Sequence, residues 1–184
     1  MKASSKLCGP FVPVGFRYTT FNFPQYRHLP GETPHPRRNP LGHQFGAAEA
    51  LPRPFESARW WKSADYLFGV DLYNFAYFWE AHEAWEGIWK TTPLQPLTDL
   101  FLRGLIQVSA AMLKRVQRNA LGARSLSHRG VGRLRQVATD QPLFCGIDLP
   151  DYTSRIEQLF AAESDPLECS MDPQLHLALP QELS

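Results

Sequence analysis

Apolar residues recur at helical spacing through the middle of the chain, most clearly between Phe75 and Trp89. Counted from Phe75, aromatic side chains stand at positions i, i+3, i+4, i+10 and i+14 of this run. Residues three and four positions apart share one face of an α-helix, whereas the residues of a half-buried strand would alternate. The run therefore predicts one long helix that begins at Asp71, its N-terminal cap, and ends before residues 91–96.

The same spacing, together with capping residues, predicts four further helices. They cover approximately residues 57–68, 98–118, 119–138 and 151–162. Asn119 and Asp151 are the expected caps of the last two, and Thr98 or Asp99 caps the helix before them. Short connections between successive helices favour antiparallel packing. We therefore expect an all-α fold, a small antiparallel helical bundle of four to five helices with an extended N-terminal arm.

The placement of proline divides the chain into three parts. More than half of the sixteen prolines precede residue 55, and proline removes a backbone donor and excludes helix from such a segment. Residues 1–57 are therefore expected to form an extended, Pro-rich arm, and aromatic residues such as Phe23 predict that it packs on the domain. Residues 58–162 would form the bundle domain, and residues 163–184 an acidic irregular tail.

The composition is that of a globular protein, with 43% hydrophobic and 20% charged residues. No run approaches the roughly 18 apolar residues that a membrane-spanning helix needs, so we expect no membrane partner. Three widely spaced cysteines, Cys8, Cys145 and Cys169, form neither a disulfide framework nor a CxxC metal site. This cysteine usage favours a reducing compartment, and the expected localisation is cytoplasmic.

Charge is unevenly distributed, although the net charge is only +1. A stretch with seven basic and no acidic residues is followed, from Asp140 onward, by nine acidic residues and one arginine. The basic residues are Lys114, Arg115, Arg118, Arg124, Arg129, Arg133 and Arg135. They can pair with acidic residues inside the fold or present a patch to a polyanion. Their mixed helical phases and the lack of a nucleic-acid motif argue against nucleic acid as a partner.

Polar residues that can perform chemistry interrupt the aromatic face of the long helix. His82 follows Trp79 by three positions and Glu86 follows His82 by four, so both lie on or beside that face, and Glu83 is adjacent. A histidine with two carboxylates offers a general acid/base pair, or a half-site in which His82 and Glu86 bind a divalent metal. Because buried charges need partners, these groups should satisfy one another or a ligand.

A structural role is the alternative explanation for the His82 and Glu86 pair. A histidine and a glutamate four residues apart commonly form a hydrogen bond that fixes the tautomer of the imidazole. The segment also resembles the zincin motif HExxH, but Glu86 stands where that motif requires its second histidine. The pattern therefore argues against a zincin protease.

The next helix could complete a site with its polar residue Gln107. Gln107 shares a face with the small residue Gly104, so another helix can approach closely and place the amide in the contact. Gly130, on the following helix, belongs to a second face of small residues. A buried amide must find partners, and His82 or Glu86 across the interface would serve.

The arm adds residues that could bind a substrate. Arg37 and Arg38 could bind an anion such as phosphate, because a guanidinium group offers a fork of donors. His35 is held stiffly between two prolines, as a ligand or catalytic residue would be, and His43 follows it in the same segment. The arm therefore predicts a substrate-binding contribution from these four residues.

Three motifs in order resemble the domain of unknown function 309 family. They are EAHE-x-x-E-x-x-W at residues 80–89, GLIQ at 104–107 and N-x-x-GA at 119–123, and the arm over residues 26–43 looks like the N-terminal extension of a bacterial branch. The resemblance implies a small all-α bundle and no established activity. Matching the family pattern singles out Glu80, His82, Glu83, Glu86, Trp89, Gly104, Gln107, Asn119 and Gly122. Trp89 becomes a further candidate for substrate binding on this ground.

Three functions are compatible with these residues, and whether the protein is an enzyme is left open. The first is a metal-assisted or general-base hydrolase acting on a small polar or phosphorylated substrate, with His82, Glu83, Glu86 and Gln107 as its catalytic candidates. The second is a non-catalytic interaction or scaffold domain, in which a His–Glu–Gln network only specifies helix register. The third is nucleic-acid binding through the basic stretch at 114–135. The sequence identifies neither the metal nor the substrate, and it is compatible with a homo-oligomer.

Overall fold

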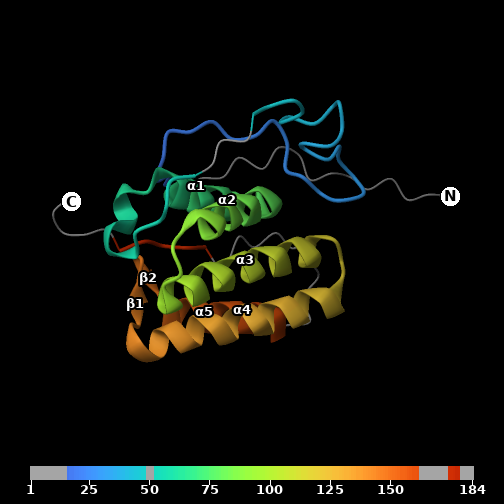
Figure 1. Cartoon of the computed structure of the whole chain (residues 1–184). Helices are drawn as coiled ribbons and strands as arrows, with labels where there is room; N and C mark the ends of the chain where they lie inside the picture. Colours follow the sequence, from blue (N-terminus) through green and yellow to red (C-terminus); the bar gives the residue numbers. More distant parts are fainter. Residues whose placement is uncertain (1–15, 49–51, 162–173, 179–184) are drawn as a thin grey trace.

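The computed structural model describes residues 16–48, 52–161 and 174–178. Within them, five α-helices, one 3-10 helix and a two-stranded hairpin form the regular structure (Figure 1). They follow one another as η1 (Ser57–Lys62), α1 (Ala64–Asn74), α2 (Phe78–Thr91), α3 (Pro96–Val116), α4 (Ala120–Asp140), β1 (Leu143–Phe144), β2 (Ile147–Asp148) and α5 (Leu149–Ala161). This confirms the predicted all-α fold class.

The helices are arranged in successive layers (Figure 1). α1 and α2 pack together and lie on one side of α3, while α4 lies on the other side and packs against α5. Only residues 117–119 connect α3 to α4, and such a short connection forces the two helices to run antiparallel. Residues 16–48, called the arm below, contain no helix or strand and cross the outer surface of the α1 and α2 layer.

The faces on which α3 and α4 meet carry small residues, as the sequence predicted. A Cβ atom at Gly104 would lie 2.7 Å from the Leu134 side chain. A Cβ atom at Gly130 would lie 2.9 Å from the Val108 side chain and 3.0 Å from the Gly104 carbonyl oxygen. Glycine at these two positions therefore sets how closely the helices approach.

The predicted single helix over residues 71–89 is wrong, because the chain forms α1 and α2 with a turn between them. The Tyr77 N–H closes the end of α1 by donating to a carbonyl five residues earlier, and Ala76 adopts a left-handed φ of 60°. Glycine usually occupies that position, so the sequence lacked the ordinary signal for a helix end. The predicted helix over residues 57–68 is likewise divided at Ser63, whose side chain caps α1.

The other helix boundaries agree with the sequence to within a few residues. Asn119 caps α4 as predicted, with its side chain accepting a hydrogen bond from a backbone N–H of the first turn. α3 begins at Pro96 rather than after a cap at 98–99. α5 begins before the expected cap Asp151, and the Asp148 side chain accepts a hydrogen bond from the Asp151 N–H at 3.0 Å.

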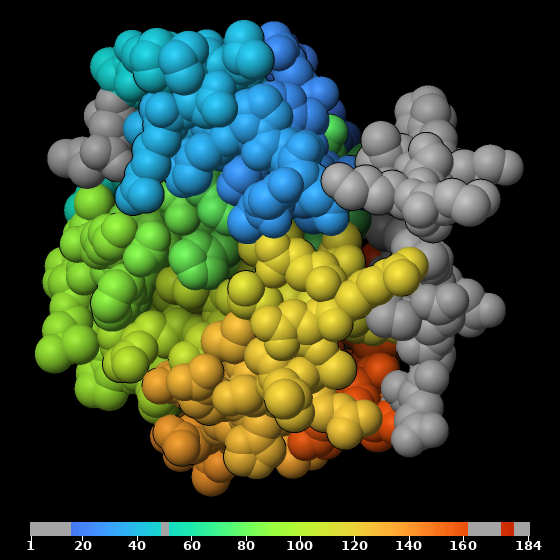
Figure 2. Space-filling model, turned by 90° about the vertical axis from the view of Figure 1, so that its right-hand side faces the viewer, coloured from blue at the N-terminus to red at the C-terminus, as the bar shows by residue number. Residues whose placement is uncertain are grey.

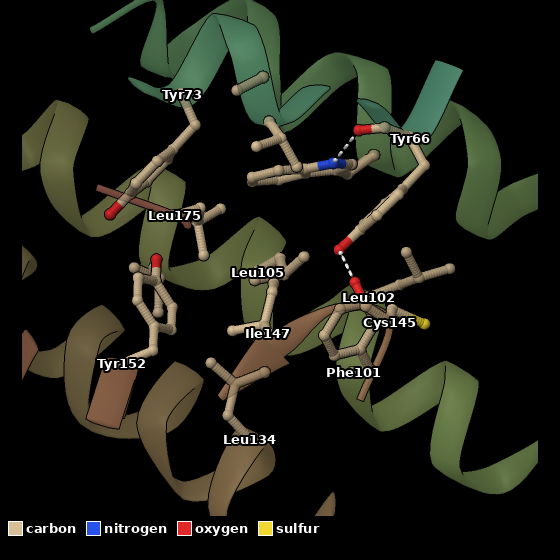
Figure 3. Close-up of a cluster of buried hydrophobic side chains, with 14 of the residues drawn as sticks. Tyr66, Tyr73, Phe101, Leu102, Leu105, Leu134, Cys145, Ile147, Tyr152 and Leu175 are labelled. Atoms are coloured by element: carbon tan, nitrogen blue, oxygen red, sulfur yellow. Dashed lines mark hydrogen bonds between the residues drawn. The ribbon is translucent and has the colours of Figure 1, made fainter. Parts of the chain in front are cut away.

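The core lies between the helices and the hairpin and includes several large aromatic residues (Figure 3). The fully buried Tyr66 hydroxyl donates to the Cys145 carbonyl oxygen at 2.9 Å, and the Trp85 indole donates to the Tyr66 carbonyl oxygen at 3.4 Å. Tyr73 and Tyr152 point their hydroxyl groups toward each other across the core. The two hydrogen bonds of Tyr66 join α1 to α2 and to the hairpin.

Asp71, the predicted N-terminal cap, lies fully buried within α1 and holds the start of the arm. Its carboxylate accepts hydrogen bonds from the backbone N–H groups of Tyr18 and Thr19 at 2.8 and 2.9 Å. It also accepts one from the Thr19 hydroxyl at 2.7 Å, and the Arg17 guanidinium lies 3.9 Å away. Asp71 therefore satisfies backbone donors of the arm instead of those of a helix end.

Asn74 holds residues 174–178 in a similar way. Its amide donates to the Leu175 carbonyl oxygen at 2.9 Å and accepts from the Leu175 N–H at 2.8 Å. The Leu177 N–H then donates to the hydroxyl of Tyr18 in the arm at 2.9 Å. The arm and residues 174–178 therefore meet beside α1.

Among the described residues, Cys145 is buried and free, and burial raises the pKa of its thiol. Cys8 and Cys169 lie outside the described residues, as does most of the predicted acidic tail. Of the described helices, none combines the length and the apolar character that a membrane span requires.

Candidate functional site

A loop of the arm, residues 26–43, covers one side of α2 and forms the upper wall of the candidate site. Figure 2 shows this loop, in blue, capping the green and yellow helices. The His28 N–H donates to the Glu80 carboxylate on α2, and the Gln117 amide at the end of α3 donates to the Pro30 carbonyl oxygen at 3.3 Å. The loop is therefore held at two separate helices.

Hydrogen bonds within the loop hold it as one unit. The Tyr26 hydroxyl donates to the Pro34 carbonyl oxygen at 2.9 Å and accepts from the His43 N–H at 3.4 Å. Nδ1 of His35 accepts from the backbone N–H groups of residues 37 and 38, both at 3.3 Å. Because Nδ1 is an acceptor, a neutral His35 ring carries its proton on Nε2. The predicted stiffness of His35 thus has a physical basis in its own turn.

Glu80 is the point at which the loop meets α2. Only 5% of Glu80 is exposed, and its Oε1 accepts from the His28 N–H at 2.8 Å. Nε2 of His43, whose side chain is 4% exposed, lies 3.7 Å from the same oxygen. Neither Glu80 Oε2 nor His43 Nε2 has a hydrogen-bond partner among the described residues. Two buried polar atoms are therefore left unsatisfied under the loop.

Burial keeps Glu80, His28 and His43 from being fully charged near neutral pH. Burial raises the pKa of Glu80 to about 7, although the hydrogen bond from His28 and the positive charge of Arg27 act in the opposite direction. Burial also lowers the pKa of His43 and of His28. Near neutral pH, Glu80 is therefore close to half-protonated while both imidazoles are neutral.

Aromatic contacts surround Glu80 on the side of the arm. The rings of His28 and His35 meet the Trp79 indole edge-on, with centroids 4.9 and 5.6 Å away. Nδ1 of His28 also lies 2.9 Å from the Thr33 hydroxyl. Trp79 of α2 thus packs against the arm rather than in the bundle core.

The predicted cluster on α2 consists of His82, Glu83 and Glu86. One donor atom from each residue can be chosen such that all three lie within 4.8 Å of one another. His82 Nδ1 lies 3.5 Å from Glu83 Oε1, and Glu86 pairs with Lys90 at 3.2 Å. The closest partner of His82 is therefore the neighbouring Glu83, whereas the sequence favoured Glu86 as its partner.

Charges from both α2 and the arm act on Glu83. The adjacent His82 lowers the pKa of Glu83, and the positive charges of Lys90 and of Arg37 in the arm lower it further against the effect of burial. Arg37 and Arg38 are both exposed. The arm therefore brings Arg37 within electrostatic reach of the cluster.

Two predicted residues have partners outside this cluster. The side-chain oxygen of Gln107 accepts from the Arg133 guanidinium of α4 at 2.6 Å, so Gln107 is bonded to α4 and not to His82 or Glu86. The Trp89 indole donates to the Asp99 carboxylate of α3 at 2.7 Å. Gln107 and Trp89 therefore join helices to one another.

Sequence reasoning gave neither Glu80 nor His28 a role in the site, although the family pattern singled out Glu80. Glu80 stood at the edge of the apolar stripe, and His28 had no metal-type spacing to the other histidines. The available signal was the EAHE motif, in which Glu80 precedes Glu83 by three residues and so lies on a neighbouring part of the same face.

A cavity in the described structure lies elsewhere. It has a volume of about 800 Å³ and lies between η1, the start of α3 and the hairpin, with Trp60, Trp61 and Leu143 among its lining residues. None of the predicted site residues lines it.

Residues 66–126 match the family described as Domain of unknown function (DUF309). The matched segment covers most of α1, all of α2 and α3, and the start of α4, and it includes His82, Glu83, Glu86 and Gln107. This confirms the family resemblance over that segment, while the motif assignment and the bacterial branch stay predictions. Neither a curated protein nor a solved structure matches the chain.

Proposed function

We propose that the junction of the arm and α2 binds a divalent cation and performs metal-assisted or general-base hydrolysis of a small polar or phosphorylated substrate. The proposal rests on the cluster of His82, Glu83 and Glu86. Each of the three residues offers one ligand atom, and these three atoms lie within 4.8 Å of one another. One imidazole and two carboxylates suit Zn²⁺ and other first-row divalent ions. Three protein ligands would leave coordination positions for water and substrate.

The residues of the cluster would have different roles in this reaction. A bound divalent ion supplies a water molecule of lowered pKa. His82 and Glu86 would hold the ion, and Glu83, whose pKa is lowered, would be an ionised ligand or the base that accepts a proton. Arg37 and Arg38 would bind the anionic part of the substrate, because guanidinium groups pair well with phosphate.

Metal binding tests this proposal directly. Protein stripped with a chelator is titrated with Zn²⁺ and with Mn²⁺ by calorimetry, and its melting temperature is measured with and without each ion. We expect the wild type to bind an ion, and His82→Ala to bind it at least about tenfold more weakly. His128→Ala, at an exposed histidine of α4, is the matched control and should bind as the wild type does. A wild type that binds neither ion overturns the proposal.

An activity screen tests the reaction class. Chromogenic phosphate and carboxylate esters are offered to the metal-loaded protein, and Glu83→Gln is compared with the wild type. We expect hydrolysis of the phosphate esters that Glu83→Gln lowers by about 100-fold or more, the usual contribution of a general base. Metal binding without hydrolysis of any of these substrates would argue for a non-catalytic role.

A non-catalytic interaction domain is the second candidate, and one observation favours it. Glu80 and Asp71 both use buried carboxylates to hold backbone N–H groups of the arm, which is what a structural polar network does. This candidate expects His82→Ala to lower the free energy of unfolding by about 1–3 kcal/mol, with no effect on binding or activity. The expected network has to omit Gln107, which is bonded to Arg133.

Nucleic-acid binding through residues 114–135 gains little support. The Arg133 guanidinium donates to Gln107, and Arg135 pairs with Glu157 of α5 at 2.6 Å. Internal pairing of part of the basic stretch leaves fewer charges for a polyanion. Gel retardation at low salt would decide the matter, and retardation that weakens steeply with salt would support this function.

A further inference from the structure

We propose that Glu80 is a positioning residue of this site, which seats the arm loop over α2 and thereby places Arg37 and Arg38 beside the His82 cluster. This inference rests on the proposed function for its catalytic meaning. Its structural part, that Glu80 seats the loop, stands on the contacts alone.

The buried N–H of His28 depends on Glu80 for its hydrogen bond. His28 is 4% exposed, and in the described structure its N–H has Glu80 Oε1 as its only acceptor, at 2.8 Å. A buried N–H without an acceptor is costly, because it has given up its hydrogen bond to water. The loop can therefore close on α2 only while residue 80 offers an oxygen at this place.

The loop is held together internally, so that holding one end positions the rest. Glu80 accepts from the His28 N–H near the start of the loop, and His43 Nε2 at its end lies 3.7 Å from the same carboxylate. Between these residues, the loop is held by the Tyr26 hydroxyl, which also accepts from the His43 N–H, and by the turn around His35. Arg37 lies within that turn. A carboxylate that holds the start of such a loop therefore also determines where Arg37 lies.

Two substitutions at residue 80 test the acceptor. Glutamine keeps a side-chain carbonyl oxygen that can accept from the His28 N–H. Alanine removes the acceptor altogether. The variants Glu80→Gln and Glu80→Ala therefore separate loss of the carboxylate charge from loss of the hydrogen bond.

Hydrogen exchange of the loop amides, measured by mass spectrometry at pH 7, tests whether Glu80 holds the loop. We expect the loop of Glu80→Ala to exchange at least about tenfold faster than that of the wild type, as loss of a buried hydrogen bond requires. We expect the loop of Glu80→Gln to exchange much more slowly than that of Glu80→Ala, because glutamine keeps the acceptor. Glu157→Gln, at a glutamate paired on α5, is the control and should match the wild type.

Two results would overturn the inference. One is equal exchange of the loop in Glu80→Ala and the wild type while the bundle is intact by circular dichroism. The other is a Glu80→Gln loop that is as open as the Glu80→Ala loop, because glutamine retains the acceptor. Since both variants keep His28 and His43, the difference between Glu80→Gln and the wild type reports the carboxyl group itself.

A second measurement links the seat to the site. The probes are Mn²⁺ alone and inorganic phosphate added to the Mn²⁺-loaded protein, both followed by calorimetry. We expect Glu80→Ala to bind Mn²⁺ as the wild type does but to bind phosphate at least about fivefold more weakly, because the arginines are displaced. Equal phosphate affinity in both proteins would overturn the placing of the arginines. A wild type that binds no Mn²⁺ would overturn the proposed function, while the exchange result would still decide whether Glu80 seats the loop.

Discussion

Two tryptophans of one helix show how differently the two sides of α2 are built. Trp85 is fully buried in the bundle core, where its indole donates to the Tyr66 carbonyl oxygen. Trp79 faces the arm, is only partly buried and meets the edges of His28 and His35. One side of the helix is thus packed by apolar residues, and the other is covered by a polar loop.

The two sides of α2 differ in the interactions that would be lost if the helix separated from its neighbours there. In the core, separation would expose large apolar surfaces, which dominate the free energy of folding. The part of the arm that holds Phe21 and Phe23 packs on Phe68, Phe75 and Tyr77, but at the loop of residues 26–43 separation would mainly release the hydrogen bond to Glu80 and the edge contacts with Trp79. Water can replace that hydrogen bond. We infer that this loop opens locally while the bundle stays folded, as segments with few apolar contacts generally do. A site covered by such a segment can admit a ligand without unfolding.

The largest expected effect comes from replacing each tryptophan in turn. Trp85→Ala should lower the free energy of unfolding by about 3–5 kcal/mol, because it leaves a cavity in a close-packed core. Trp79→Ala should cost less than about 2 kcal/mol and should raise hydrogen exchange only in the arm. Chemical denaturation measures the first quantity and hydrogen exchange the second. Equal losses of global stability would show that the arm and the bundle unfold as one unit.

A smaller change in stability is expected when either of two glycines of α4 with different surroundings is replaced by alanine. Gly130→Ala should destabilise the bundle by about 1–3 kcal/mol, because the new Cβ would lie 2.9 Å from Val108 and 3.0 Å from the Gly104 carbonyl oxygen. Gly132→Ala has no atom within 4 Å of its new Cβ and should stabilise the helix by about 0.5–1 kcal/mol. Thermal denaturation of the pair measures both. A stabilised Gly130→Ala would contradict the close approach of α3 and α4.

The smallest expected effect on the bundle comes from releasing the start of the arm. Asp71→Ala removes the acceptor for the N–H groups of Tyr18 and Thr19, and their protection from exchange should fall by about tenfold or more. Because these N–H groups can turn to water once the arm opens, global stability should fall by no more than about 1–2 kcal/mol. Asp65→Ala, at the first turn of the same helix, is the control. A collapse of global stability in Asp71→Ala would show that the arm is integral to the core.

Local patterns were enough to predict most of the bundle. The spacing of aromatic residues on α2 and the cap at Asn119 follow from interactions within one turn of helix, which neighbouring residues encode. The close contact of Gly104 with α4 also followed from residue size alone. The break between α1 and α2 did not, because Ala76 adopts a conformation that the sequence signals only when glycine is present.

The candidate site was predicted in part, for a related reason. His82, Glu83 and Glu86 lie within five residues of one helix, so helix geometry alone brings them together. Glu80 and His28 are 52 residues apart, and their contact depends on how the arm crosses α2. Asp71 shows the same limit, since its side chain looked like a helix cap and is instead an acceptor for residues 18–19. Contacts made by an irregular segment leave no periodic trace in a sequence.

The meeting of residues 18–19 with residues 175–177 beside α1 has a consequence for how the protein is made. Asp71 accepts from the N–H groups of residues 18–19, Asn74 bonds Leu175, and the Tyr18 hydroxyl joins the two segments through the Leu177 N–H. During synthesis the helices leave the ribosome before Leu175 and Leu177 do. Contacts of such high sequence separation form late and slowly. Asn74 therefore stays uncovered until residues 174–178 have been made, and a fusion that replaces these residues would leave its acceptor and donor open.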